Sequence, residues 1–251
     1  MTTAERTDYA SLWTPRSLEE AMYQIDTSRC NDRDEFFAEG ERIAERLSQY
    51  VPEHCNTVVE FGCGIGRILV HVPGQYRVGI DVSAEMLAYA RDLFPDVHFQ
   101  TQYTVSSLLW PYEPQADFLY SWLVLQHMDF DDAIEAICAM VNALRPGGVA
   151  ALLFAGYGGP WSKPGVVPEY EAEQVFDPEN DRYGCPGHRM VAWQRAHVDQ
   201  IGTELFQSYE VIPIAGMSDR EEAWLRERNA EAFENPDWSP YYLLVGTKAA
   251  L

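Results

Sequence analysis

The stretch that most constrains the fold of this chain is residues 58–67, Val-Val-Glu-Phe-Gly-Cys-Gly-Ile-Gly-Arg. It opens with two β-branched apolar residues, which are typical of a parallel strand buried on both faces. Three alternating glycines follow at Gly62, Gly64 and Gly66. A turn with so few side chains lets a ligand approach the backbone, and a helix after it would offer free N–H groups at its N-terminus. The sequence therefore predicts a buried strand, a ligand-binding glycine turn and a helix.

The spacing of the glycines bears on which ligand the turn binds. A dinucleotide fingerprint, G-x-G-x-x-G, would need its third glycine at the position of Arg67. The pattern here is instead E-x-G-x-G-x-G, with Glu60 two residues before the first glycine. A nicotinamide oxidoreductase is therefore the least favoured of the hypotheses below.

Apolar segments of strand length alternate with amphipathic segments of helix length from residue 57 onward. Strands are expected at 57–61, 77–80, 97–101, 117–121, 149–155, 209–214 and 241–247, and helices at 66–72, 84–94, 131–144, 188–206 and 218–233. This alternation predicts a parallel sheet with helices on both faces. Residues 1–55 predict a helical N-terminal extension, whose first helix begins at the capping box Ser17-Leu18-Glu19-Glu20 and whose second covers 32–50.

Composition excludes several classes of protein. With 251 residues, of which 47% are hydrophobic, the chain can bury a sizeable core and is not disordered. The formal net charge of −21 repels phosphate backbones, so nucleic acid is not expected as a partner. The same charge suits a neutral or cationic small substrate, or only keeps the surface well solvated.

The cysteines and the apolar runs indicate the cellular compartment in which the protein is expected. The five cysteines are scattered without a C-x-x-C pair, which indicates neither a zinc site nor a disulfide framework. No run approaches the roughly 20 apolar residues of a membrane span. Glu5, Arg6 and Asp8 precede any apolar run, which argues against a secretory signal. We expect a cytoplasmic protein without membrane contact, and the sequence leaves monomer and homodimer open.

Four segments in order resemble one family. Glu60–Gly66 resembles motif I of class I S-adenosylmethionine (SAM)-dependent methyltransferases, and Asp81 ends the next expected strand as an acid does in that family. Asp117–Met128 resembles the family's fourth-strand region, and Arg145–Gly148 resembles the turn before its fifth strand. The resemblance covers about residues 58–155. It implies a three-layer, doubly wound Rossmann-like α/β fold with an antiparallel last strand, SAM as cofactor and methyl transfer as the reaction.

The resemblance also implies how SAM is held. The glycine turn would lie under the methionine part and ribose, and Asp81 would accept hydrogen bonds from two ribose hydroxyls through its two oxygens. The family's adenine-binding acid after the third strand is absent, so either Tyr103 would stack on adenine, or Ser106 or Ser107 would bond to it. The implied cofactor residues are Glu60, Gly62, Cys63, Gly64, Gly66, Asp81, Val82, Met86, Tyr103, Ser121 and Trp122.

The catalytic candidate is His127, just beyond the fourth strand. Methyl transfer from a sulfonium can be accelerated by positioning alone, and a general base helps only if the acceptor must lose a proton. A histidine bonded to backbone beneath the sheet end is the alternative interpretation. No ordered set of acids suggests a metal site, because Asp129, Asp131 and Asp132 are explained by a helix N-terminus.

The acceptor would be a small molecule methylated on oxygen, nitrogen or carbon, with a specialised metabolite as one candidate. Residues 156–187 form an aromatic and acidic insertion within the SAM-binding domain 56–251, and with the extension 1–55 they either close over the substrate or only pack. Expected substrate-binding residues are Tyr23, Tyr157, Trp161 and His188. Two other hypotheses stay open: another SAM reaction, such as cyclisation or aminocarboxypropyl transfer, and a non-catalytic SAM-binding module.

Overall fold

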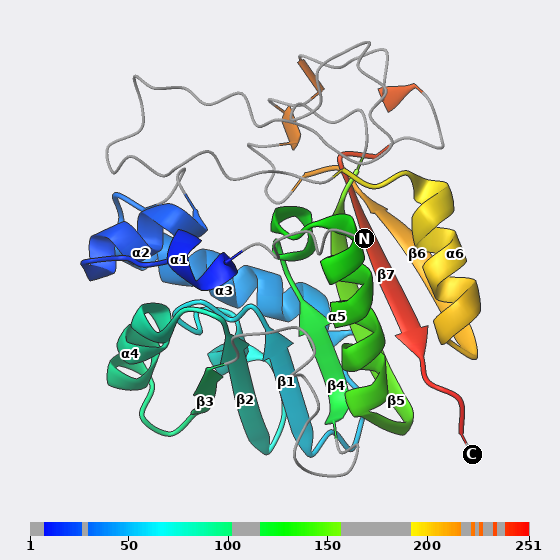
Figure 1. Cartoon of the computed structure of the whole chain (residues 1–251), viewed down its shortest axis with the longest axis horizontal. Helices are drawn as coiled ribbons and strands as arrows, with labels where there is room; N and C mark the ends of the chain where they lie inside the picture. The colour runs from blue at the N-terminus through cyan, green and yellow to red at the C-terminus, as the bar shows by residue number, and fades with distance from the viewer. Residues whose placement is uncertain are drawn as a thin grey trace, which may run out of the picture.

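A computed structural model describes residues 8–26, 30–101, 116–156, 192–216 and 239–250, with the short pieces 222–223, 226–227 and 233–234. Its centre is a seven-stranded sheet in the order β3-β2-β1-β4-β5-β7-β6, in which β7 runs antiparallel to both neighbours (Figure 1). The strands are β1 (Thr57–Phe61), β2 (Tyr76–Asp81), β3 (His98–Thr101), β4 (Ala116–Ser121), β5 (Leu144–Ala155), β6 (Ser208–Ile214) and β7 (Tyr241–Thr247). The expected α/β fold with an antiparallel last strand is confirmed.

Helices cover both faces of the sheet. On one face α5 (Phe130–Ala143) and α6 (Arg195–Leu205) pack with Val59, and on the other α3 (Arg33–Ser48) and α4 (Ala84–Leu93) pack with Val58 (Figure 1). The two valines point to opposite faces because successive strand residues alternate. Both are nearly fully buried, which is why this strand is apolar without interruption.

Strand register brings three carboxyl ends together. Phe61 at the end of β1 pairs with Ile80 of β2 on one side and with Ser121 of β4 on the other. The residues that follow these three strands therefore meet at one edge of the sheet. In open parallel sheets this is the edge at which ligands bind.

The N-terminal helices lie over this edge. Helices α1 (Tyr9–Leu12) and α2 (Leu18–Ile25) lie beyond the carboxyl ends of β1 and β2 (Figure 1). The Ser17 side chain accepts a hydrogen bond from the Glu20 N–H, as the capping box predicted. Besides the two clusters around Val59 and Val58, a third apolar cluster joins α2 and α3 to the glycine turn and to α4. It consists of Ala21, Met22, Phe36, Ile65 and Met86.

Three local expectations are corrected. The segment 66–72 contains only the 3₁₀ turn η1 (Leu69–His71) rather than a helix. Arg145–Gly148 lies within β5 rather than in a turn before it. Within the described residues, α6 begins at Arg195, later than position 188. No helix in the described parts of the chain is long and apolar enough to cross a membrane.

Candidate cofactor and methyl-transfer site

The glycine turn is fixed by its own backbone. Gly62, Gly64 and Gly66 have φ of 74°, 51° and 80°, a region that side chains other than glycine rarely adopt. The N–H groups of Gly62 and Cys63 donate to the Ile80 carbonyl at 2.7 and 3.0 Å, and that of Gly66 donates to the Cys63 carbonyl at 2.8 Å. These N–H groups are therefore not free for a ligand, because the first two anchor the turn to β2 and the third closes the turn on itself.

Asp81 joins the turn to the start of α4. Its Oδ2 accepts from the Gly64 N–H and its Oδ1 from the Ser83 N–H, both at 2.8 Å. Ser83 itself caps α4 by accepting from the Met86 N–H at 3.0 Å, so Asp81 is not needed as the cap. The Asp81 side chain is partly exposed, and each oxygen can accept a second bond. Two adjacent hydroxyls of a ribose fit these remaining positions.

Glu60 lies beneath the turn. Burial raises its carboxyl pKa to about 8, against the opposing effects of Tyr120 and the Arg67 guanidinium. Its Oε2 is buried and has no hydrogen-bond partner among the residues that the structure describes. A carboxyl oxygen left in this state fits a ligand that brings a hydrogen-bond donor, such as an amino group.

Neighbouring elements fill the space that side chains would take at the three glycines. A Cβ built on Gly62 would lie 2.2 Å from Val124 Cγ2, and one on Gly64 would lie 2.9 Å from Ile25 Cδ1. At Gly66 the nearest atom would be Phe99 Cζ, at 3.0 Å. The glycines thus allow β3, the end of α2 and the segment after β4 to close around the turn.

The segment after β4 contains a strained turn. Leu123, with φ of 59°, is the one non-glycine residue of the described chain with a positive φ, and such strain is frequent at functional sites. Ser121 Oγ before it donates to the Phe61 carbonyl at 3.2 Å and so ties the ends of β4 and β1. Trp122 and Gln126 are buried, and Trp122 Nε1 and Gln126 Oε1 lack partners among the described residues.

His127 packs against the N-terminal segment. The His127 ring meets that of Trp13 edge to face, with 5.3 Å between centroids. The backbone N–H of His127 donates to the Val124 carbonyl at 2.9 Å. Nearby, Tyr9 OH donates to Asp132 Oδ2 and accepts from the Asp129 N–H, both at 2.8 Å. Residues 8–26 therefore contact the start of α5 as well as the glycine turn.

The other expected site residues divide into three groups. Cys63 is buried, and burial raises the pKa of its thiol well above the ordinary value, which agrees with a packing role. Met86 is buried in the third apolar cluster, whereas Val82 beside Asp81 and Tyr23 on α2 are partly exposed. The remainder lie outside the described residues: Tyr103, Tyr157, Trp161 and His188.

Sequence reasoning missed four residues of this region: Trp13, Ile25, Asp26 and Arg67. Their contacts join segments that are far apart in the chain, which a local sequence pattern does not reveal. The only sequence signal for any of them was that Arg67 occupies the position of the third glycine of a dinucleotide motif. In the described ranges no three His, Cys, Asp or Glu side chains gather as a metal site.

Comparison with known proteins identifies the class. Residues 58–148 match the family model described as "Methyltransferase domain". The chain is 34% identical over 122 residues to a trans-aconitate 2-methyltransferase of Azoarcus sp. (strain BH72), covering 47% of this chain and 46% of that protein. It is 34% identical over 128 residues to a malonyl-[acyl-carrier protein] O-methyltransferase of Pectobacterium atrosepticum, covering 49% and 47%. The chain thus spans about half the length of either relative.

The whole fold has a counterpart among solved structures. A SAM-dependent methyltransferase from Mesorhizobium loti superposes with a TM-score of 0.55 and 20% sequence identity, over 81% of this chain and 96% of that one. At this identity the likeness concerns the fold. Together with the match of residues 58–148 to a methyltransferase domain, it supports the resemblance to class I SAM-dependent methyltransferases.

Proposed function

We propose that the protein transfers the methyl group of SAM to a small-molecule acceptor. The observation that carries the proposal is the Asp81 carboxylate, which lies against the glycine turn at the carboxyl end of β2 with a second acceptor position on each oxygen. The ordered match to methyltransferase domains over residues 58–148 supports the same reaction.

The described residues suggest how the cofactor would be held. Asp81 would bind the ribose hydroxyls, the buried Glu60 would accept from the amino group, and the backbone at Gly62–Gly66 would support the methionine part. Ser121 and Trp122 would lie beside the methyl group at the end of β4. Bound SAM would supply an activated methyl group on a sulfonium. The protein would supply position, an environment without bulk water and, where needed, a route for a proton.

The first acceptor candidate is a carboxylate oxygen. The two relatives are named for trans-aconitate and for a malonyl group, and both present carboxylates. A carboxylate is already ionised at neutral pH, so no proton has to be removed before attack. In that case His127 would only orient the acceptor, whereas a hydroxyl or amine acceptor would give His127 the role of general base.

The test is incubation with methyl-labelled SAM and a panel of acceptors: trans-aconitate, a malonyl thioester, a phenol, an amino sugar and a metabolite extract. Label in a product together with stoichiometric S-adenosylhomocysteine supports the proposal. Consumption of SAM without labelled product or S-adenosylhomocysteine would indicate another SAM reaction. Tight S-adenosylhomocysteine binding without turnover on any acceptor would indicate a binding module. Cytoplasmic location and the absence of nucleic-acid partners stay predictions.

A further inference from the structure

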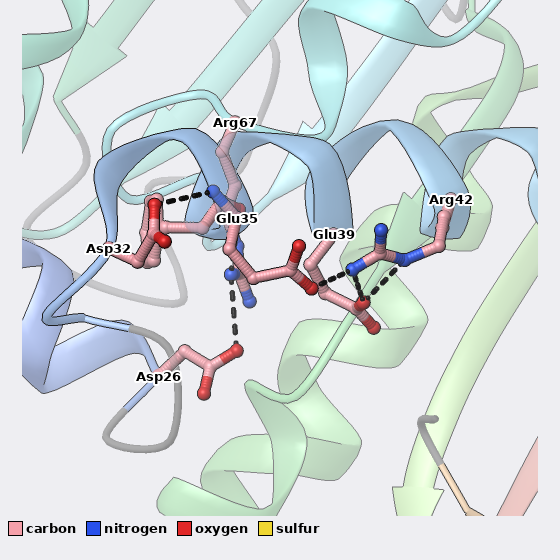
Figure 2. Close-up of polar contacts among 7 residues, drawn as sticks. Asp26, Asp32, Glu35, Glu39, Arg42 and Arg67 are labelled. Atoms are coloured by element: carbon pink, nitrogen blue, oxygen red, sulfur yellow. Dashed lines mark hydrogen bonds and ion pairs between the residues drawn. The ribbon is translucent and has the colours of Figure 1, made fainter. Parts of the chain in front are cut away.

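Arg67 follows the last glycine of the turn but points away from the cofactor side, between α2 and α3. Its side chain is 5% exposed, and Nη1 lies 3.3 Å from Asp26 Oδ2 and 3.4 Å from the Phe36 carbonyl oxygen (Figure 2). The guanidinium carbon stands 4.3 Å from the centroid of the Phe36 ring, in cation–π geometry. An arginine placed in this way is a fixed part of the packing.

The backbone of Arg67 is held as tightly as its side chain. A Cβ built on Gly40 of α3 would lie 2.2 Å from the Arg67 carbonyl oxygen, so only glycine allows this approach. Helix α3 therefore lies directly on the residue that ends the glycine turn.

The partner of Arg67 stands at the end of α2. Asp26 is the C-cap of this helix, and its side chain is 13% exposed. The residue before it, Ile25, contacts Gly64 of the turn. The Arg67–Asp26 ion pair therefore fixes the end of α2 at the point where it covers the turn.

We propose that Arg67 is a positioning residue of the cofactor site. Through its ion pair with Asp26 it holds Ile25 against Gly64, so that α2 stays over the glycine turn and slows exchange of the bound cofactor. This inference rests on the proposed function, because it requires the cofactor at Gly62–Gly66. Loss of one partner of a nearly buried ion pair removes the charge-assisted contact between the end of α2 and the turn, which favours release of α2.

The test measures dissociation of S-adenosylhomocysteine by stopped-flow competition. We expect Asp26→Asn to raise the dissociation rate about tenfold, since changes in a contact act mostly on the off-rate. Asp26→Glu, which keeps the charge, should stay near the wild-type rate. The matched control is Glu35→Gln, which removes a carboxylate from an exposed pair with Arg42 on the neighbouring helix α3 (Figure 2). Thermal unfolding without ligand is measured for every variant.

The outcomes separate positioning from plain stability. A wild-type rate in Asp26→Asn, or an equal rise in Glu35→Gln, overturns the inference even if the melting temperature falls. If Asp26→Asn does not fold, Arg67→Gln takes its place, because glutamine removes the charge that pairs with Asp26. A wild-type dissociation rate in Arg67→Gln overturns the inference in the same way. Absence of S-adenosylhomocysteine binding by the wild-type protein would instead refute the proposed function.

Discussion

The two halves of the ligand-binding edge are built differently. Around the ends of β1 and β2, the turn and Asp81 are held by backbone hydrogen bonds to Ile80, Gly64 and Ser83. At the end of β4, Leu123 is strained and Trp122 is buried with its N–H unpaired among the described residues. The polar contacts of the first half join residues 62–83, whereas the second half contacts the N-terminal segment through Trp13 and Tyr9. This is what we expect where a shared cofactor meets a variable acceptor.

The largest effect should come from the turn itself. Gly62→Ala combines an unfavourable positive φ with a clash against Val124, so we expect a loss of about 4 kcal/mol in the free energy of unfolding. Gly147→Ala is the matched control, because Gly147 has φ of 77° but nothing within 4 Å of a Cβ. It should cost about 1 kcal/mol. Denaturant unfolding measures both, and equal losses would contradict the packing argument.

Asp81→Ala tests the cofactor half directly. Removing the carboxylate takes away the ribose acceptor and the anchor of Gly64, so S-adenosylhomocysteine should bind about 100-fold more weakly, or about 2.7 kcal/mol. Asp92→Asn on the exposed part of α4 is the control and should bind as the wild type does. If calorimetry gives Asp81→Ala an affinity for S-adenosylhomocysteine within twofold of the wild type, Asp81 does not bind the cofactor.

His127→Ala tests the other half. It should leave S-adenosylhomocysteine affinity unchanged and lower kcat about 30-fold, because the acceptor loses an orienting or proton-accepting group. The kcat–pH profile distinguishes the roles: loss of an acidic limb indicates a base, and an unchanged shape indicates orientation. Unchanged turnover would mean that His127 only packs against Trp13.

The smallest effect concerns the buried Glu60. Its pKa is about 8 in the folded protein and ordinarily 4.5, so the folded state keeps the proton to higher pH than the unfolded state does. Raising the pH between these values should therefore destabilise the fold, by about 1 kcal/mol per pH unit. Glu60→Gln should remove this slope between pH 5.5 and 7.5 in denaturant unfolding, and the exposed Glu85→Gln serves as control. If the pH dependence of the free energy of unfolding persists in Glu60→Gln, it arises from other titratable groups.

The sequence correctly predicted those elements whose bounds depend on residues close together in the chain. The bounds expected for β1 and β7 agree with Thr57–Phe61 and Tyr241–Thr247, because apolar runs bounded by turn residues set strand ends. Arg145–Gly148 was predicted as a turn, but hydrogen bonds from Gly147 N–H to the Lys248 carbonyl and from Lys248 N–H to the Gly148 carbonyl extend the sheet there. That pairing joins segments about a hundred residues apart, and a local pattern does not contain it.

In the candidate site too, local arrangements were predicted from sequence and long-range contacts were not. Asp81 was placed beside the turn from sequence, because parallel strands bring their carboxyl ends to one edge. Trp13 beside His127 and Ile25 on Gly64 were not predicted, since each depends on how the N-terminal helices dock. The roles expected for Tyr103, Tyr157, Trp161 and His188 stay predictions, because these residues lie outside the described chain.

The residue at position 67 links two properties of the molecule that would otherwise be independent. A third glycine there would restore a dinucleotide-type spacing, and the same substitution would delete the buried contacts with Asp26 and Phe36. A protein with that change would lose the ion pair and the cation–π contact that join the glycine turn to the ends of α2 and α3. The residue whose position departs from a dinucleotide spacing is thus also the one that ties the N-terminal helices to the cofactor turn.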